Sequence, residues 1–385
     1  MSLRLKYLSF YLIFLVLYAL FNYYPALRGY QALHPHYPAL AWAWLIVVFI
    51  GAALLPGSRY LSKYLPHNAS RLLMLLSNYW LGTVFYLFLM VLAADLIRLV
   101  DRCFNLLPPA YKTPHPAIAL LIMVLIVMLQ VYGSWNARKP VIRHYRLTLD
   151  KKSSKLETLQ VVMVSDIHLG WIVGLDRLNQ LIDDINVLNP DIVLLAGDVI
   201  DEGADLTVEA GIPQAFGRLI SRYGTFAVPG NHEYISRQVY RVGQYLDAAG
   251  VTVLRDRWIR LDDSLYLVGR DDLTRGRFTT VDRKAISDLM QGINCEELPV
   301  LLMDHQPFNL DQSAQAGVDL QFSGHTHLGQ FFPNNLITNT MYEQDWGYLR
   351  RDNFQLIVSC GYGTWGPPIR IGNRPEIVVV AIEFQ

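Results

Sequence analysis

The stretch Val161-Val162-Met163-Val164-Ser165-Asp166-Ile167-His168 decides the fold expected for this chain, because it joins an apolar, β-branched run directly to polar side chains. Short apolar runs of this kind are typical of strands that are buried on both faces. The arrangement recurs four times further along the chain, at 192–201 (IVLLAGDVID), 226–233 (FAVPGNHE), 300–305 (VLLMDH) and 319–327 (DLQFSGHTH). The five stretches together predict a sheet whose strand ends carry the functional side chains.

Strand and helix patterns alternate from residue 156 onward. The spacing predicts a helix over 175–188, where leucine and isoleucine recur every three or four positions before Asn189-Pro190 ends the pattern. A strand, a helix and a second strand in this order favour an α/β domain with a largely parallel core sheet and helices outside it. We predict strands at 159–165, 191–196, 225–229, 265–269, 300–304, 318–323, 354–359 and 377–382.

Charge and hydropathy divide the 385 residues into two unlike halves. Only 17% of the chain is charged, against about 25% in average soluble domains, and its mean hydropathy is +0.23. Residues 1–135 contain two acids and nine Lys or Arg, a net charge of +7, while the remainder contains 31 acids and 24 bases. The composition excludes disordered, collagen-like and disulfide-scaffold classes, and it predicts a membrane region followed by a water-soluble domain.

Four apolar runs in the first half approach the roughly 20 residues that cross a bilayer as a helix. The first run resembles a secretory signal, but no A-x-A-like cleavage site follows it, so we expect a retained helix. Asp95 and Arg98 lie near a predicted helix end, where snorkelling accounts for their charge. We predict a transmembrane region at 1–136 with helices near 8–24, 39–55, 72–92 and 117–135, a basic linker at 137–156 and a soluble domain at 157–385.

The basic residues predict the orientation of the helices, because Lys and Arg that flank a span tend to stay in the cytoplasm. With four spans, twelve of these bases fall on the side of the soluble domain, which is therefore expected in the cytoplasm. The basic stretch 138–155 has two explanations, a flank that stops translocation or a surface that holds the domain against anionic headgroups. The other side of the membrane receives four bases, namely Arg28, Arg98, Arg102 and Lys112.

The polar side chains at the five strand ends are of types that bind divalent metals. Strand ends at one edge of a sheet converge on a crevice, and alternate residues such as Asp166 and His168 point the same way. Imidazole and carboxylate together suit Zn, Mn or Fe. Two metals about 3.5–4 Å apart need a bridging ligand, and together they activate water for a phosphoryl displacement. A carboxylate can bridge two metals, whereas a neutral imidazole cannot.

The ordered set D-x-H, G-D-x-x-D, G-N-H-[DE], H and G-H-x-H resembles the calcineurin-like metallophosphoesterase family. All five blocks occur without departure between Asp166 and His327, and the resemblance covers residues 157–385. The closing stretch 359–370 (SCGYGTWGPPIR) is similar to the bacterial membrane-associated branch of that family. The resemblance implies a four-layered αββα sandwich with its two sheets face to face, and two divalent metal ions, with manganese, iron and zinc as the candidates.

The resemblance also implies a role for each polar residue. Asp198 would bridge the two metals, and a hydroxide activated by them would attack phosphorus in line. His232 would protonate the leaving oxygen or steady the transition state, with Asp201 orienting its imidazole. The implied ligands are Asp166, His168 and His327 on the first metal and Asn231, His305 and His325 on the second.

Three further features each leave two explanations open. Arg370 either contacts substrate phosphate as a bidentate donor or pairs with Glu376. The charged loop 271–277 is either a solvated face or a substrate clamp. The glycines that precede Asp198 and His325 fit turns that require a positive φ, although turn chemistry alone would not demand a metal-binding side chain after each of them.

The sequence thus predicts a membrane-anchored phosphohydrolase on an inner membrane of bacterial type, with a phosphoester substrate and membrane lipids as its partners. A lipid-linked phosphoester is the sharper expectation for the substrate. Two alternatives stay open, a UDP-acyl-sugar pyrophosphatase-like enzyme of lipid A synthesis and a membrane scaffold that binds metal without turnover. Nucleic acid is not an expected partner, because the soluble half is net acidic and has no dense basic and aromatic pattern.

Overall fold

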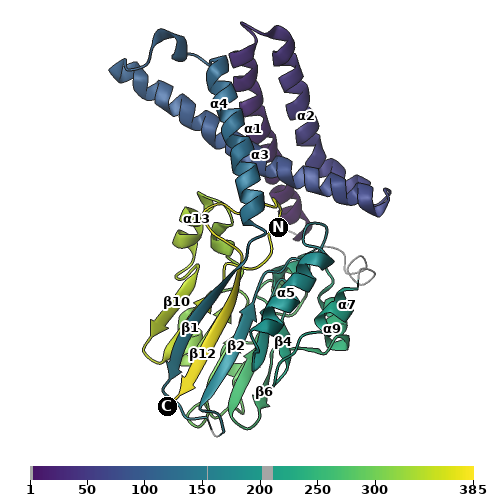
Figure 1. Ribbon diagram of the computed structural model, residues 1–385, viewed down its shortest axis with the longest axis vertical. Helices are drawn as coiled ribbons and strands as arrows, with labels where there is room; N and C mark the ends of the chain where they lie inside the picture. Colours follow the sequence, from purple (N-terminus) through teal and green to yellow (C-terminus); the bar gives the residue numbers. More distant parts are fainter. Residues whose placement is uncertain (1–2, 154, 202–210) are drawn as a thin grey trace. The chain divides into compact units, whose positions relative to one another are not determined.

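The computed structural model describes residues 3–153, 155–201 and 211–385, and the chain divides into two compact units. The helical unit comprises Met1–Ser134 with Gly366–Ile369, and the sheet unit comprises Trp135–Trp365 with Arg370–Gln385. Figure 1 shows long helices in the first unit and two layers of strands in the second.

Long helices make up most of the helical unit. Among the described residues, three of these helices are long and apolar enough to cross a membrane, namely α2, α3 and α4. Part of the first expected span, 8–24, lies outside the residues whose side chains are described, so the fourth span stays a prediction. The elements are α1 (Leu3–Leu33), α2 (Pro38–Leu61), α3 (His67–Phe104), the short 3₁₀ helix η1 (Pro109–Tyr111) and α4 (Pro116–Asn136).

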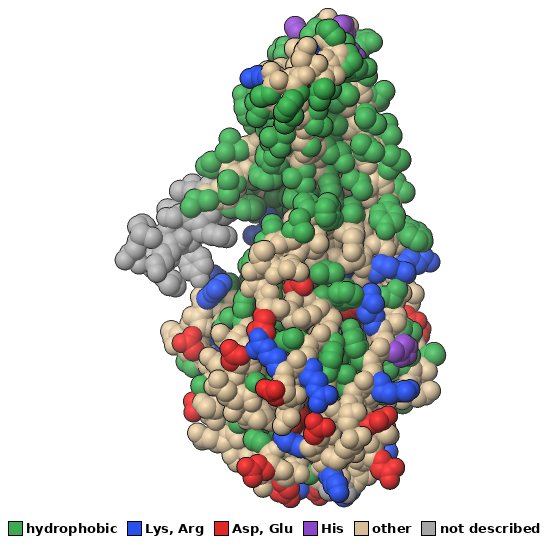
Figure 2. Space-filling model, turned by 90° about the vertical axis from the view of Figure 1, so that its left-hand side faces the viewer, with side chains coloured by type: hydrophobic (Ala, Val, Ile, Leu, Met, Phe, Trp, Pro, Cys, Tyr) green, Lys and Arg blue, Asp and Glu red, His purple; other side chains and the backbone are tan. Residues whose placement is uncertain are grey.

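These helices extend beyond the expected spans, and two prolines lie inside them. Pro25 lies within α1 and Pro56 lies within α2, where a connector was expected. Large apolar side chains face outward, such as Phe49 with 76% of its surface exposed and Val131 with 66%. Figure 2 shows hydrophobic side chains over the visible face of this unit. An outer surface of this kind suits a hydrocarbon surrounding.

Asp95 forms ion pairs inside the helical unit, and the expected snorkelling does not describe it. Its Oδ2 lies 2.7 Å from Nε of Arg28 on α1, and its Oδ1 lies 2.7 Å from Nη1 of Arg98 on the next turn of α3. The hydroxyl of Tyr24 donates a hydrogen bond to Oδ2 at 2.5 Å. Charges next to hydrocarbon pair with one another because an unpaired charge there is costly.

The sheet unit contains two six-stranded sheets (Figure 1). The first sheet has the order β1 (Val141–Leu149), β12 (Glu376–Phe384), β2 (Thr158–Val164), β3 (Ile192–Ala196), β4 (Thr225–Val228) and β5 (Val251–Val253). The second has the order β10 (Gly347–Arg351), β11 (Phe354–Val358), β9 (Leu320–Ser323), β8 (Val300–Met303), β7 (Leu265–Gly269) and β6 (Arg257–Leu261). All eight predicted strands are confirmed to within two residues at either end.

Parallel pairing dominates both sheets, as expected. Strands β2, β3, β4 and β5 pair in parallel, and so do β7, β8, β9 and β11. The antiparallel pairs are β12 with β2, β10 with β11 and β6 with β7. Both sheets are therefore mixed. Their central strands are parallel, so the carboxyl ends of these strands lie at the same edge of each sheet.

Three apolar clusters show how the sheets and helices are layered. One cluster joins residues of both sheets, including Met163 and Leu194 from the first and Leu301 and Phe322 from the second, so the two sheets pack face to face. A second cluster packs the first sheet against α5 (Leu175–Val187), α7 (Ile212–Phe216) and α9 (Val239–Ala248). A third packs the second sheet against α11 (Ile286–Leu289) and α12 (Leu310–Gln315).

The segment expected as a basic linker contains strand β1, which is a correction to the sequence analysis. β1 pairs in parallel with β12 along its whole length, and its exposed and partly buried residues alternate. Several of its bases, and those that follow, have acidic partners: Arg143 lies 2.9 Å from Glu376, and Lys151 lies 2.8 Å from Asp319. These bases form ion pairs within the sheet unit. Neither of the two explanations given for the basic stretch included this role.

Candidate metal centre

The predicted ligands lie where the carboxyl ends of parallel strands from both sheets meet the following loops. Asp166 and His168 follow β2, Asp198 follows β3, His305 follows β8, and the two last histidines follow β9. Non-glycine residues with a positive φ are uncommon and mark strain that often serves a site. Five of the predicted ligands have one, namely Asp166 (53°), His168 (52°), Asp198 (51°), His325 (72°) and His327 (51°).

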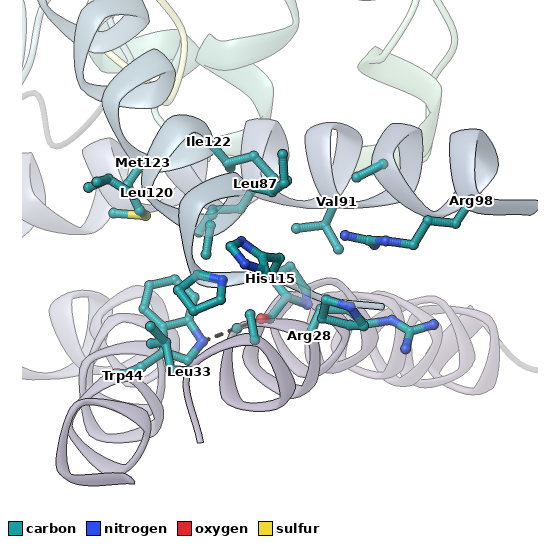
Figure 3. Close-up of a pocket in the computed structure, with 18 residues that line it drawn as sticks. Arg28, Leu33, Trp44, Leu87, Val91, Arg98, His115, Leu120, Ile122 and Met123 are labelled. Carbon is teal, nitrogen blue, oxygen red and sulfur yellow. Dashed lines mark hydrogen bonds between the residues drawn. The ribbon is translucent and has the colours of Figure 1, made fainter. Parts of the chain in front are cut away.

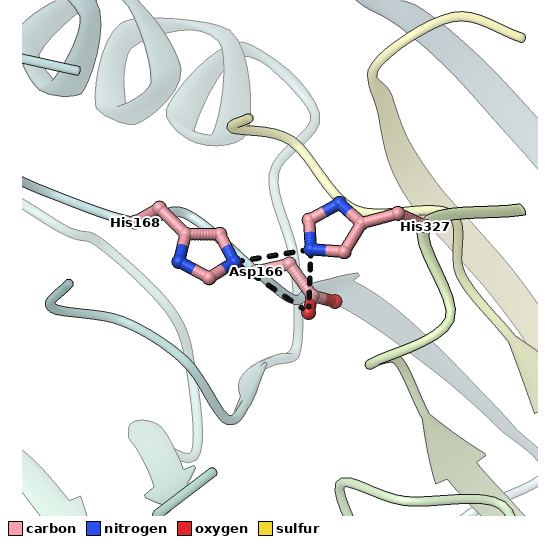
Figure 4. A group of neighbouring side chains, drawn as sticks. All are labelled: Asp166, His168 and His327. Carbon is pink, nitrogen blue, oxygen red and sulfur yellow. Dashed lines mark hydrogen bonds and ion pairs between the residues drawn. The ribbon is translucent and has the colours of Figure 1, made fainter. Parts of the chain in front are cut away.

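Asp166, His168 and His327 form the first group of possible ligands (Figure 4). The Nε2 atoms of the two histidines lie 3.0 Å apart, and Oδ1 of Asp166 lies 3.4 Å from Nε2 of His327 and 3.9 Å from Nε2 of His168. Asp166 is fully buried, and the two histidines are 2% and 8% exposed. Three donor atoms that face one another at these distances are better suited to binding a shared cation than to hydrogen bonding with one another.

Asp198, His305 and His325 form the second group. Nδ1 of His305 donates to the carbonyl oxygen of Ala196 at 2.8 Å, which leaves Nε2 to face the site. That Nε2 lies 3.1 Å from Oδ2 of Asp198 and 3.2 Å from Oδ1 of Asn231. A backbone carbonyl that fixes the second ring nitrogen is the usual arrangement of a metal-binding histidine.

Asp198 lies between the two groups. Its Oδ2 is 3.1 Å from Nε2 of His305 in the second group and 3.9 Å from Nε2 of His168 in the first. Its Oδ1 accepts the backbone amide of His232 at 2.8 Å, which fixes the carboxylate. A single carboxylate in this position can contact cations on both sides.

His232 and Asp201 form a pair at the edge of the site. Nδ1 of His232 lies 2.5 Å from Oδ1 of Asp201, and Nε2 is left to face a reactant. The Nδ1 hydrogen bond fixes the tautomer of the ring. His232 also falls in a third group of possible ligands with His168 and Asp198, so its chemistry as a proton donor has to be tested against metal binding.

Three glycines of the sequence pattern are required by the closeness of the ligands. A Cβ at Gly230 would lie 2.2 Å from Oδ1 of Asp198, and a Cβ at Gly324 would lie 2.3 Å from Oδ2 of Asp166. A Cβ at Gly197, whose φ is +90°, would lie 2.4 Å from Nδ1 of His305. Turn chemistry therefore explains Gly197, whose φ is positive. At Gly230 and Gly324, the close approach of a carboxylate explains the glycine.

Burial and neighbouring charges set the protonation of the site histidines. Burial lowers the pKa of His325 to about 4 and that of His327 well below its usual value, so both rings are neutral, the form that binds a metal. Burial also works to lower the pKa of His232, but the carboxylates of Asp198 and Asp201 outweigh it and raise that pKa to about 9. Without metal ions bound, His232 therefore holds a proton at neutral pH.

The donor set fits divalent cations. Imidazole nitrogen and carboxylate oxygen together suit Zn, Mn or Fe, and both groups of possible ligands have donor atoms within 4.8 Å of one another. The two carboxylates are almost completely buried, where an anion needs a compensating positive charge. The residues present thus fit the metal ions that the sequence pattern implies.

Protein groups other than Glu376 occupy the guanidinium of Arg370. Its side chain is fully buried, and Nη2 donates to the carbonyl oxygens of Gly363 at 2.7 Å and Cys360 at 2.8 Å. Nη1 donates to Oδ1 of Asn373 at 3.0 Å. Glu376 instead accepts the amide of Cys360 at 2.9 Å. A guanidinium occupied in this way is not available to a substrate phosphate.

The segment that Arg370 holds lies against the first group of ligands. The amide of Gly363 donates to the carbonyl oxygen of Asp166 at 2.7 Å, and the amide of Tyr362 donates to that of Ser165 at 3.0 Å. A Cβ at Gly363 would lie 2.1 Å from the carbonyl oxygen of Ile167. Arg370 therefore positions the backbone of the β2 loop.

The charged loop 271–277 is not a solvated face, because its two acids are fully buried. Asp271 accepts the hydroxyl of Tyr234 at 2.6 Å and Nη1 of Arg275 at 3.0 Å. Asp272 accepts Nε2 of Gln306, the residue after the ligand His305, at 2.9 Å. Both acids are occupied by protein donors, so they support the loop that follows β8.

Two residues at the site had no role in the sequence analysis. Glu233 accepts the amides of Ile200 at 3.0 Å and Gly230 at 2.8 Å, which ties the β3 loop to the β4 loop. Trp365 is 58% exposed, and its ring centroid lies 6.1 Å from that of His232. Glu233 could have been found from the sequence, because it is the final acid of the G-N-H-E block. No motif or spacing in the sequence identifies Trp365.

Comparison with known proteins identifies the class. A family model described as calcineurin-like phosphoesterase matches residues 159–329. A zebrafish (Danio rerio) protein named "Transmembrane protein with metallophosphoesterase domain" is 30% identical over 88% of this chain and 80% of its own length. The bovine (Bos taurus) protein of the same name is 30% identical over 70% of this chain and 62% of its own length. An uncharacterized metallophosphoesterase of Helicobacter pylori is 30% identical over 63% of this chain and 64% of its own length.

The chain belongs to the calcineurin-like metallophosphoesterase family. It is a metal-dependent phosphoester hydrolase, and its apolar helices together with its transmembrane relatives make it a membrane protein.

Proposed function

We propose that the chain is a membrane-anchored phosphodiester hydrolase that uses two divalent metal ions held at the strand ends. The observation that carries the proposal is the convergence of seven buried or half-buried donor side chains from five loops. Asp198 is the proposed bridging ligand. The proposed ligands are Asp166, His168 and His327 for one ion and Asn231, His305 and His325 for the other.

The metal ions, when bound, supply Lewis acidity and a nucleophile derived from water. The protein supplies a proton and orientation. His232 presents Nε2 toward the reactants, and in this proposal it donates a proton to the leaving oxygen. Asp201 keeps the ring oriented through Nδ1, and Glu233 fixes the two loops that carry the pair. Trp365 offers an apolar surface on which the leaving group can pack.

Hydrolysis of model esters by the purified full chain in detergent tests the proposal. With Mn²⁺ added, we expect turnover of bis(p-nitrophenyl) phosphate, and elemental analysis should find two divalent ions per chain. Turnover of p-nitrophenyl phosphate alone would make the enzyme a monoesterase. Bound metal without hydrolysis of either ester would favour the scaffold alternative and overturn the proposal.

We further propose that the substrate is a lipid-linked phosphoester, because the hydrolase is attached to helices that suit a bilayer. The full chain and a soluble fragment should then hydrolyse bis(p-nitrophenyl) phosphate equally, while the full chain alone hydrolyses phosphoesters in a lipid extract. The fragment has to begin before Val141, because β1 belongs to the first sheet. Equal activity of both on soluble and lipid substrates would mean that the helices are merely an anchor.

The sheet unit is proposed to lie in the cytoplasm, supported by four spans and the distribution of flanking bases. Cys103 provides the test, because it is exposed near the end of α3 while Cys360 is buried. A membrane-impermeant maleimide should label Cys103 in right-side-out vesicles, and Cys103→Ser is the control. If the label that is lost in Cys103→Ser appeared only in inside-out vesicles, the orientation would be the reverse.

A further inference from the structure

The helical unit contains two adjoining cavities of opposite character. The apolar cavity, of about 210 Å³, is lined mainly by hydrocarbon side chains, including Leu33, Leu87, Val91 and Met123. The polar cavity, of about 720 Å³, is lined by charged side chains of α1, α3 and the segment before α4. Arg28, Arg98 and Pro114 line both cavities, so the two meet at these residues.

The side chains around the apolar cavity separate by chemistry. Figure 3 shows Arg28 and Arg98 toward one end, and Leu33, Trp44 and Met123 toward the other. Nε1 of Trp44 donates to the carbonyl oxygen of Ala26 at 3.2 Å, so the polar atom of the indole is satisfied and its ring lines the cavity. The lining therefore matches a molecule that is apolar along most of its length and anionic at one end.

The polar cavity carries an excess of positive charge. Its lining contains four cations and two carboxylates, of which Asp95 is shared between Arg28 and Arg98 at 2.7 Å each. Asp101, the second carboxylate, lies 3.8 Å from Nζ of Lys112. Ion pairing between α1 and α3 thus accounts for part of the charge, and two positive charges remain for an anion.

Charged side chains in a membrane region are costly and are kept where they serve a function. We propose that the helical unit binds a membrane phospholipid with an anionic headgroup. Its phosphate lies between Arg28 and Arg98 in the polar cavity, and part of an acyl chain lies in the apolar cavity. Asp95 holds both guanidinium groups in position through its two oxygens. This site belongs to the helical unit and does not depend on the proposed reaction.

Binding can be measured on the full chain in detergent with chelator present, so that no phosphoester is hydrolysed. The probe is dihexanoyl phosphatidic acid, and the reference probes are dihexanoyl phosphatidylcholine, glycerol 3-phosphate and inorganic phosphate. We expect phosphatidic acid to bind at least roughly tenfold more tightly than each reference probe, since each lacks either the net charge or the chains. Equal binding of inorganic phosphate or of phosphatidylcholine would overturn the proposal.

Two substitutions separate the headgroup from the chain. Arg98→Gln should weaken phosphatidic acid binding roughly tenfold to a hundredfold, because it removes a charged donor. Ala119→Phe, on α4 in the wall of the apolar cavity, should weaken phosphatidic acid binding and leave phosphate binding unchanged. The matched control is Arg71→Gln, because Arg71 is exposed on the same helix α3 and lines neither cavity.

Folding of each variant is checked by hydrolysis of bis(p-nitrophenyl) phosphate with Mn²⁺, which should stay at the level of the unchanged protein. If Arg98→Gln does not fold, Arg102→Gln replaces it, because Arg102 lines the polar cavity and is exposed. Identical phosphatidic acid binding by the cavity variants and by Arg71→Gln would refute the lipid site. That result would leave the proposed hydrolase intact, since its activity is measured separately.

Discussion

Replacing Gly230 by alanine should dismantle the metal centre, although it adds a single methyl group. Gly230 has an ordinary φ of −107°, so the backbone itself tolerates alanine. The new Cβ would lie 2.2 Å from Oδ1 of Asp198 and 2.5 Å from its backbone nitrogen, whereas ordinary contact begins at 3.4 Å. The Asp198 carboxylate would have to retreat by about 1 Å, and ligand distances tolerate about 0.2 Å. A displacement of this size costs about 100-fold in rate.

The matched control is Gly174→Ala. Gly174 begins α5 as Gly230 begins α8 (Asn231–Ile235), with a similar backbone conformation of φ −97° and ψ −173°. A Cβ there meets no atom within 4 Å, so we expect a loss of less than about 1 kcal/mol in the free energy of unfolding and full activity. Metal content by elemental analysis and hydrolysis of bis(p-nitrophenyl) phosphate distinguish the two variants. A Gly230→Ala protein with two metals and normal turnover would refute the assignment of Asp198 as bridging ligand.

Three further predictions concern the same site. His232→Ala should lower turnover roughly 100-fold to 10,000-fold while metal content stays unchanged, and loss of metal would instead make His232 a ligand. Arg370→Lys should lower the free energy of unfolding by about 2–4 kcal/mol without changing KM, because most of its hydrogen bonds go to backbone carbonyls; an increased KM with an unchanged melting temperature would instead support a contact with substrate. Chelation with EDTA should abolish hydrolysis and lower the melting temperature, both reversible with Mn²⁺, since the metal binds the folded state alone; an unchanged melting temperature would contradict this reasoning.

The strands that the sequence did not predict share one property, since all four lie at the edges of the two sheets. β1 and β5 flank the first sheet, and β10 and β6 flank the second. The predicted strands include the fully buried β3 and β8, which appear in sequence as unbroken apolar runs. Edge strands such as β1 alternate exposed and partly buried residues and carry bases, so the same criterion classed it as a linker.

At the site, the sequence pattern predicted which possible metal ligands come together. The roles of the neighbouring charged residues depend on packing, which the sequence does not show. The pattern D-x-H to G-H-x-H brings its members into three overlapping groups of possible ligands because each block follows a strand of the same two sheets. Arg370 and Asp271 could not be interpreted in this way. Their partners are backbone carbonyls and side chains from other loops, which no spacing along the chain reveals.

The position of β12 has a consequence for how the protein is made. This strand comes after every other strand in the sequence, yet it lies between β1 and β2, the first two. On the ribosome, β1 and β2 emerge early and have to wait, with apolar surface uncovered, until residues 376–384 have been synthesised. Nonsense mutations that remove this strand should therefore leave anchored, protease-sensitive chains rather than a weakened enzyme.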